Sequence, residues 1–199
     1  MDPLRVQRVA AVVLAAGAST RLGQAKQRVR VGGESLLHRT VRMAVEAGCS
    51  PVVAVLGFEA ERMRPELEGL DAVAALHPGW AEGMGSSLRC GIEAVSRMEP
   101  LPDAVLVLVC DQPRLTVKHL RALLERHQSG RAGVTASAYA GRTGVPAVFA
   151  QALFGELRRL EGDRGARELI RSHAGQAKGI PWPEGTVDLD VPEDLRRID

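Results

Sequence analysis

Continuous apolar runs rich in Val, Leu and Ala alternate along the chain with segments whose apolar residues recur at helical spacing. The apolar runs occupy residues 9–16, 51–56, 72–76 and 104–110. The helical segments occupy residues 36–47, 58–67, 86–98 and 116–127. We expect Ser35 and Thr116 to cap the first and the last of these helices. A continuous apolar run is typical of a strand that is buried on both faces of a sheet. The alternation therefore predicts an α/β protein, a three-layer α/β/α sandwich around a mostly parallel, Rossmann-like sheet.

The second half of the chain predicts smaller elements of the same domain. We expect a strand at 134–139, a glycine-rich turn at 141–146 that leads into 147–149, and helices at 150–160 and 166–173. No long linker, repeat or low-complexity segment interrupts the pattern. We therefore expect one domain that spans residues 1–199.

The first predicted strand opens into a loop of small, flexible and basic residues. Gly17 and Gly23 allow backbone amides to approach a ligand closely, and such amides can converge on an anion. Arg21 and Lys26 add full positive charges. Lysine is rare among the 26 Lys and Arg residues, so a compact ammonium at position 26 is a distinctive choice. The loop indicates a binding site for a phosphate chain, and a glycine-rich turn without a ligand is the alternative.

A lone acid follows the most apolar predicted strand. Asp111 comes directly after residues 104–110, at the tip of a strand where open α/β sheets bind their ligands. Its carboxylate suits Mg²⁺, which usually takes one or two protein carboxylates together with substrate phosphates. Alternatively, Asp111 only begins a turn before Pro113. We expect Cys110 to lie in the core, because no base that could activate its thiol is evident.

Composition excludes several classes of function. The net charge is +2 and no run of Lys and Arg exceeds two residues, which argues against nucleic-acid binding. Three widely spaced cysteines indicate a reducing compartment, and the five histidines show no zinc spacing. The first residues resemble no signal peptide and no apolar run is long enough to span a membrane. We expect a cytoplasmic protein with no membrane partner.

Several segments resemble the signatures of one enzyme family. Residues 14–26 are similar to the motif L-A-A-G-x-S-x-R-x-G-x-x-K of the MobA-like nucleotidyltransferases, which include the molybdenum-cofactor cytidylyl- and guanylyltransferases. Residues 80–88 resemble W-x-x-G-M-x-x-S-L, residues 110–116 resemble C-D-Q-P-x-L-T, and residues 188–194 resemble D-[IL]-D-T-P-E-D. The first motif is neither a P-loop nor a dinucleotide fingerprint. The resemblance extends over nearly the whole chain.

The resemblance assigns roles to particular residues. The catalytic residues would be Arg21, Lys26 and Asp111. The nucleotide would lie against Leu14, Ala15, Ala16, Gly17, Ser19, Trp80, Gly83 and Ser87. The acceptor would lie against Gly144, Pro146, Asp163 and Arg167. The metal would be held by Asp111 with Asp188 or Asp190.

Purely structural alternatives exist for some of these positions. Ser86 or Ser87 is also a good helix N-cap, and residues 141–146 would look the same in a plain β-hairpin. Asp163 could cap the following helix. Asp190 with Glu193 has the spacing of a capping box, whereas period-two alternation places Asp188 and Asp190 on one face of a strand.

The resemblance implies transfer of CMP from CTP to the molybdopterin cofactor, with Mg²⁺ and release of pyrophosphate. The sequence Leu-Ala-Ala-Gly at 14–17 favours the cytidylyl branch, because the guanylyl branch usually has Leu-Ala-Gly-Gly. A molybdoenzyme is a possible transient partner. The alternatives are guanylyl transfer to the same cofactor, a sugar-phosphate nucleotidyltransferase, and a non-catalytic cofactor carrier or a redox relative that uses a nicotinamide cofactor.

Overall fold

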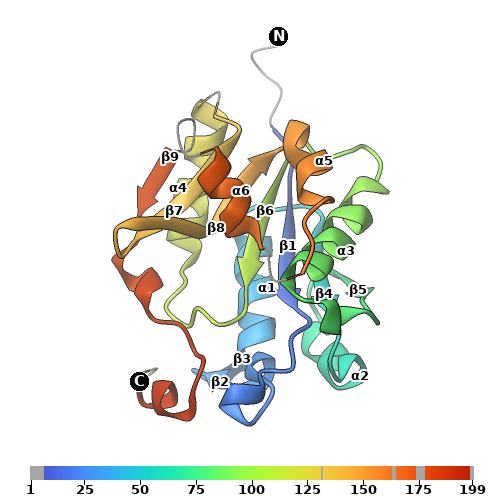
Figure 1. The fold of residues 1–199 in the computed structure, drawn as a ribbon, viewed down its shortest axis with the longest axis vertical. Coiled ribbons are helices and arrows are strands. Elements are labelled where there is room, and N and C mark those ends of the chain that lie inside the picture. Colours follow the sequence, from blue (N-terminus) through green and yellow to red (C-terminus); the bar gives the residue numbers. More distant parts are fainter. Residues whose placement is uncertain (1–6, 131, 163–164, 174–177, 198–199) are drawn as a thin grey trace.

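Strand β1 (Val9–Ala15) lies inside a seven-stranded sheet, between two parallel neighbours, in the computed structural model, which describes residues 7–130, 132–162, 165–173 and 178–197. The strand order is β5-β4-β1-β6-β8-β7-β9 (Figure 1). The other strands are β4 (Val52–Leu56), β5 (Val73–Leu76), β6 (Ala104–Val109), β7 (Val134–Tyr139), β8 (Arg142–Ala150) and β9 (Lys178–Pro181). A separate two-stranded sheet pairs β2 (Arg30–Val31) with β3 (Glu34–Ser35).

Parallel pairing brings the ends of the central strands to one edge. β1 pairs in parallel with β4 through Ala15↔Leu56 and with β6 through Leu14↔Val109. β8 runs antiparallel to both of its neighbours, whereas β7 and β9 are parallel to each other. The mostly parallel sheet confirms the predicted fold class. The chain segments that follow β1 and β6 therefore emerge side by side.

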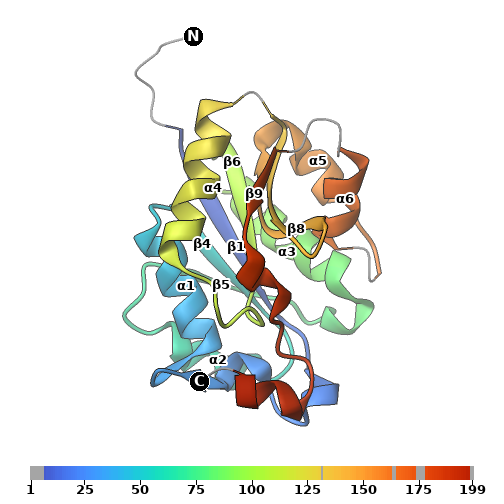
Figure 2. The same ribbon diagram turned by 90° about the vertical axis from the view of Figure 1, so that its left-hand side faces the viewer.

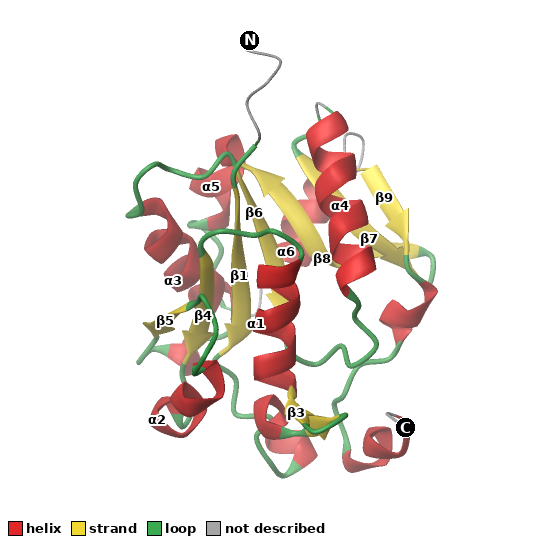
Figure 3. Cartoon of the chain, turned by 180° about the vertical axis from the view of Figure 1, so that it is seen from behind, coloured by secondary structure: helices red, strands yellow, loops and turns green. Residues whose placement is uncertain are grey.

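Helices cover both faces of the sheet. α1 (Leu36–Glu46) and α4 (Val117–Ser129) pack on one face, which Figure 3 shows in front. α3 (Met84–Ser96), α5 (Phe154–Leu157) and α6 (Ala166–Ser172) pack on the other face, whereas the short α2 (Ala60–Met63) lies near the sheet edge (Figure 1). The turned view in Figure 2 separates the two helical layers. None of the described helices is long and apolar enough to cross a membrane.

Alternating side chains of β1 build two aliphatic cores. Ala11 and Val13 belong to the core beneath α1 and α4. Ala10 and Val12 belong to the core beneath α3, α5 and α6. Both sets are fully buried, so the continuous apolar run of β1 is explained by burial on both faces.

Two helices begin where their predicted caps place them. The Ser35 hydroxyl accepts a hydrogen bond from the His38 amide at 3.1 Å, and the Thr116 hydroxyl accepts one from the His119 amide at 3.3 Å. Each bond satisfies an amide that the first helical turn leaves unpaired. α3 differs, because it begins at Met84 after Gly83, so the expectation that Ser86 or Ser87 is its N-cap is wrong.

Some predicted elements are shorter than expected. The predicted helix at 58–67 is divided into α2 and a 3-10 turn at Arg64–Leu67 that contains Pro65. The predicted helix at 150–160 is a 3-10 turn, Gln151–Leu153, followed by the short α5. The predicted glycine-rich turn is instead the start of β8, and the chain reverses at Ala140 and Gly141, both of which have positive φ.

A buried polar chain connects α4 to β8. His119 is 7% exposed, and its Nε2 lies 2.8 Å from the Ser137 hydroxyl. Because that hydroxyl donates its hydrogen to the Pro146 carbonyl at 2.8 Å, Nε2 must carry the hydrogen of the His119–Ser137 bond. The imidazole also stacks on Trp182 at 4.8 Å between ring centroids. Burial lowers the pKa of His119 from 6.5 to about 4.

We expect the free energy of unfolding to fall as the pH is lowered from 7 to 4. In this range the unfolded chain protonates His119 and the folded chain does not, so the loss reaches about 3 kcal/mol at most. Urea unfolding at several pH values measures the loss, and His119→Gln provides the comparison because glutamine does not titrate. An equally steep pH dependence in His119→Gln would contradict the assignment.

Candidate active site

An ammonium and two carboxylates meet at the carboxyl edge of the parallel strands. Lys26 begins a 3-10 turn, Lys26–Arg28, in the loop after β1, and Asp111 follows the end of β6. Lys26 Nζ lies 2.8 Å from Asp111 Oδ2 and 3.2 Å from Asp190 Oδ1. Asp111 and Asp190 lie 85 and 164 positions from Lys26 in the sequence, so both contacts exist only in the folded chain.

The charge of Lys26 is stabilised by its partners. Burial on its own would lower the pKa of Lys26, since it penalises the charged form. The attraction of Asp111, its hydrogen bond, and the weaker contribution of Asp190 together outweigh this penalty and raise the pKa above 10.5. Lys26 is therefore a fixed positive charge at neutral pH, and it offers no base.

Local hydrogen bonds shape the loop that carries Lys26. Ser19 adopts the left-handed conformation at φ 52°, and its hydroxyl accepts a hydrogen bond from the Lys26 amide at 3.2 Å. The buried Gln27 donates from Nε2 to the carbonyls of Ala15 at 2.9 Å and Gly17 at 2.7 Å. Sequence reasoning did not identify Gln27, although a buried amide next to a phosphate-loop motif is an informative signal.

A cavity of about 430 Å³ opens above the Lys26–Asp111 pair. Most of the residues predicted to bind the nucleotide or the metal line it, namely Leu14, Ala16, Gly17, Ser19, Arg21, Lys26, Trp80, Gly83, Ser87, Asp111 and Asp190. Ala15 does not line it: its side chain lies in the core beneath α1, and its carbonyl is bonded to Gln27. The buried Cys110 also lines this cavity, and burial raises the pKa of its thiol to about 12, so no thiolate is present at neutral pH.

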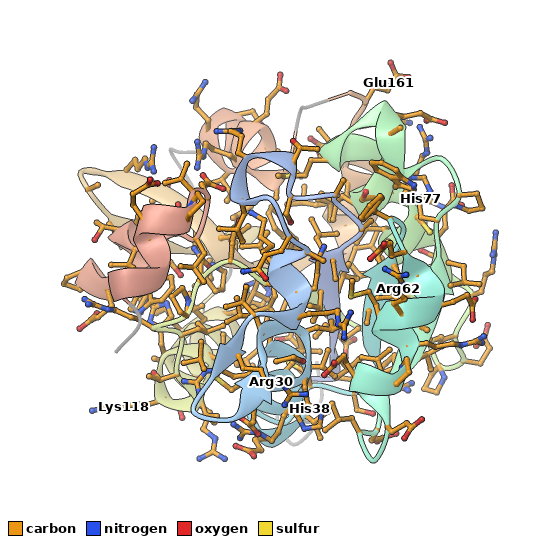
Figure 4. All side chains as sticks on the ribbon, turned by 90° about the horizontal axis from the view of Figure 1, so that it is seen from below. Arg30, His38, Arg62, His77, Lys118 and Glu161 are labelled. Carbon is orange, nitrogen blue, oxygen red and sulfur yellow. The ribbon has the colours of Figure 1, made fainter. Side chains whose placement is uncertain are left out.

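Trp80 forms an aromatic wall of this cavity. The indole meets the Phe58 ring edge to face at 5.5 Å between centroids. Gly57 permits the close approach, because a Cβ atom there would lie 2.5 Å from Trp80 Cβ and 2.8 Å from the Ala16 carbonyl oxygen. The His77 ring, labelled in Figure 4 on the view from below, lies 2.8 Å from the Ser86 hydroxyl and holds the start of α3. Gly57 and His77 therefore position the wall without lining the cavity.

The C-terminal segment reaches the site without forming a strand. The Leu189 amide donates to the Asp111 carbonyl at 2.9 Å. Asp194 Oδ2 accepts from the amides of Asp190 at 3.0 Å and Val191 at 3.1 Å. Two predictions for this segment are wrong. Residues 187–190 pair with no strand, so Asp188 and Asp190 do not share a strand face. The cap is supplied by Asp194, and not by a capping box of Asp190 with Glu193.

Asp188 faces two other acids. Burial, followed by repulsion from Asp111 and Asp190, raises the pKa of Asp188 from 3.8 to about 6. Its Oδ1 is buried and has no hydrogen-bond partner among the described residues. Within the same described part of the chain, no three His, Cys, Asp or Glu side chains are placed to hold a metal ion by themselves. The carboxylates therefore suit a hard cation that brings other oxygen ligands with it.

A second cavity of about 240 Å³ adjoins the first, since Leu14, Met84, Val109 and Asp111 line both. Arg167 and Asp188 line the second cavity as well. The structure differs from expectation for Gly144 and Pro146, which are buried and do not line it, whereas Val145 between them does. Gly144 lies against the Tyr139 hydroxyl and has no room for a side chain. Asp163 lies outside the described residues.

Comparison with known proteins identifies relatives along the whole chain. The family model of the MobA-like NTP transferase domain matches residues 11–177. Nicotine blue oxidoreductase of Paenarthrobacter nicotinovorans is 32% identical over 96% of both chains. The bifunctional protein GlmU of Corynebacterium diphtheriae is 36% identical over 135 residues, which are 63% of this chain and 27% of that protein. The matched segment thus corresponds to about a quarter of GlmU.

A solved structure supports the same relationship. The manganese complex of Rv0371c from Mycobacterium tuberculosis H37Rv has a TM-score of 0.75 and 27% identity over 98% of both chains. A divalent metal is thus bound by a related protein of the same length and fold.

We expect Gln27→Leu to destabilise the protein and loosen the loop. Leucine leaves the buried Ala15 carbonyl and the Gly17 carbonyl without their donor, which costs about 1–3 kcal/mol of unfolding free energy. Urea unfolding measures the loss, and proteolysis within residues 17–25 reports the loop. The exposed Gln24→Leu is the matched control and should change neither quantity. Equal stability of the two variants would contradict the role of Gln27.

Proposed function

Since the chain belongs to the MobA-like NTP transferase family, we propose that it transfers CMP from CTP to the molybdopterin cofactor in the cytoplasm and releases pyrophosphate. An oxygen of the acceptor phosphate attacks the α-phosphorus of the nucleotide. A new P–O bond forms there, the bond to the bridging oxygen breaks, and pyrophosphate carries away the electron pair. No covalent intermediate on the protein is needed.

The observation that carries this proposal is the 2.8 Å contact between Lys26 and Asp111 at the base of a cavity bounded by the glycine-containing loop. A positive charge and a metal-binding carboxylate side by side match what a metal-bound triphosphate requires. Phosphoryl-type transfers depend on positioning and on neutralisation of the developing charge, and this edge of the sheet supplies both.

Each part of the first cavity has a role in this proposal. Lys26 and Arg21 neutralise the triphosphate, and the amides of residues 16–19 bind its β- and γ-phosphates. Trp80, Gly83 and Ser87 line the same cavity, and the ribose and base would lie against them. The small residues leave room for the nucleotide, and the aromatic ring provides an apolar surface for it.

The carboxylates fit a magnesium ion that arrives with the nucleotide. Asp111, with Asp190 or Asp188, would hold it, and phosphate oxygens would complete the coordination. Mg²⁺ would supply charge neutralisation at the α-phosphate. Lys26 Nζ contacts Asp111 Oδ2, so a metal held by that carboxylate would bring its phosphates within reach of the ammonium.

The second cavity is proposed to hold the acceptor, with Arg167 near its phosphate. Gly144 and Pro146 would act by placing Val145 on the cavity wall, and Asp163 is proposed from the family resemblance alone. The choice of CTP over GTP is supported by the Leu-Ala-Ala-Gly sequence at 14–17. A molybdoenzyme that receives the product is the proposed transient partner.

Two comparisons define the rival functions. The similarity to nicotine blue oxidoreductase along 96% of the chain favours a redox activity as the second candidate. The shorter similarity to GlmU makes transfer of a nucleotide to a sugar phosphate the third candidate. The paired ammonium and carboxylates distinguish the transferase proposals, because hydride transfer from a nicotinamide cofactor requires no metal-bound triphosphate.

The deciding experiment supplies each NTP with Mg²⁺ and molybdopterin and measures pyrophosphate. We expect release with CTP, and a loss of kcat/KM of about 100-fold or more in Lys26→Ala and in Asp111→Asn, since each removes a group that neutralises charge at the transferred phosphate. Lys118→Ala is the matched control, because Lys118 is an exposed lysine on α4, labelled in Figure 4, and lines no cavity described above.

The outcomes separate the candidates. Pyrophosphate release with GTP alone would identify GTP, and not CTP, as the nucleotide substrate. Pyrophosphate release only in the presence of a sugar 1-phosphate would identify the sugar phosphate, and not molybdopterin, as the acceptor. Oxidation of NADH or NADPH without pyrophosphate release from any NTP would overturn the transferase proposal in favour of the redox function. Full activity in either Lys26→Ala or Asp111→Asn would overturn the proposed roles of these residues.

A further inference from the structure

A third and larger cavity continues from the second. It measures about 680 Å³ and lies between the β7–β8 hairpin and α6. Tyr139 and Arg167 line both this cavity and the 240 Å³ cavity beside Asp111. The three cavities are therefore neighbours in a row that leads away from the Lys26–Asp111 pair toward the hairpin, with Tyr139 and Arg167 between the second and the third.

The outermost cavity is strongly basic. Arg142, Arg167 and Arg171 line it, and no Asp or Glu is among its described lining residues, which otherwise are Ala138, Tyr139, Ala140, Gly141, Thr143 and Pro183. Arg142 is held against the wall of this cavity, because its guanidinium lies over the Tyr139 ring at 5.6 Å from the ring centroid.

Some arginines near the surface are neutralised by glutamates. Arg42, Arg62 and Arg89 each form an ion pair with a glutamate at 2.6–3.2 Å. Arg142, Arg167 and Arg171 form no ion pair within the described part of the chain. Asp188 lies within electrostatic range of Arg142 but does not line this cavity. Three guanidinium groups on one cavity without an ion-paired carboxylate among the described residues create a positive field that attracts an anion, and each presents a fork that matches an oxyanion.

We propose that this arginine pocket, defined by Arg142, Arg167 and Arg171, binds a second anionic group of the acceptor, at the end remote from the phosphate that reacts. This inference rests on the proposed function, because the reacting phosphate must lie beside Asp111 to reach the nucleotide. The group in the arginine pocket must then be a different one. The 240 Å³ cavity between them holds the body of the acceptor.

The proposal defines a class of substrate. The acceptor is an elongated phosphate ester whose opposite end carries an oxyanion, either another phosphate, a carboxylate or a metal-bound oxo group. A small sugar phosphate with one anionic group would leave the arginine pocket empty. Arg142 and Arg171 thereby become residues that determine acceptor specificity without contacting the reacting atoms.

The first test needs no acceptor. Inorganic phosphate, and molybdate in a second series, are added to the Lys26→Ala protein, which lacks the ammonium of the nucleotide site. Modification of individual arginines by phenylglyoxal is then followed by mass spectrometry. We expect either oxyanion to slow modification of Arg142 and Arg171 at least about five-fold, and to leave Arg30 on the β2–β3 hairpin (labelled in Figure 4) unchanged. Unchanged rates at Arg142 and Arg171 with both oxyanions would overturn the proposal.

The second test uses turnover of the full-length protein. In Arg142→Ala/Arg171→Ala, we expect the KM for molybdopterin to rise at least about ten-fold, with the KM for Mg-CTP and the kcat at saturation nearly constant. Arg159→Ala removes an exposed arginine that lines none of these cavities and is the matched control. Thermal unfolding checks that each variant is folded.

The two tests fail in different ways. If wild type releases no pyrophosphate but phosphate protects the two arginines, the arginine pocket stands and the transferase proposal falls. If wild type turns over but neither protection nor the KM change is seen, the arginine pocket falls and the transferase proposal stands.

Discussion

Parallel pairing of β1 with β6 is the constraint on which the active site depends. Both strands are buried on both faces, so their register is set by the two aliphatic cores. Once Leu14 lies opposite Val109, the loop that carries Lys26 and the residue that follows β6 must meet at the same edge. The 2.8 Å contact between Lys26 and Asp111 follows from this register.

The charged side chains described at that edge do not neutralise one another. Lys26 is shared between Asp111 and Asp190, and Asp188 nearby is left with an unpaired buried oxygen. One ammonium facing three carboxylates leaves negative charge in excess, which a divalent cation offsets. Under the proposed function, the phosphates that accompany such a cation would meet Arg21 and Lys26, so the site would be complementary to metal and nucleotide only as a pair.

Sequence reasoning predicted the parts of the molecule that depend on local pattern. The central strands, the caps at Ser35 and Thr116 and the meeting of Lys26 with Asp111 all follow from apolar runs and from the topology they dictate. It failed where tertiary contacts decide. Asp190 arrives on an irregular segment fixed by Asp194 and by the Asp111 carbonyl. Sequence reasoning also did not identify Gln27, whose partners Ala15 and Gly17 lie 12 and 10 positions away. It did not identify Arg142 and Arg171 as neighbours either, because they share a cavity only where the fold brings β8 and α6 together.

The route of the C-terminal segment has a consequence for the order in which the molecule folds. Asp190 reaches Lys26 across 164 positions of the chain, whereas the β1–β4 pairing joins segments that are close in sequence. Closing so large a loop carries an entropic cost that is recovered only after the sheet exists. The contact between Asp190 and Lys26 therefore lowers the free energy of the chain only once the sheet is in place. The proposed metal site is complete only in the fully folded chain.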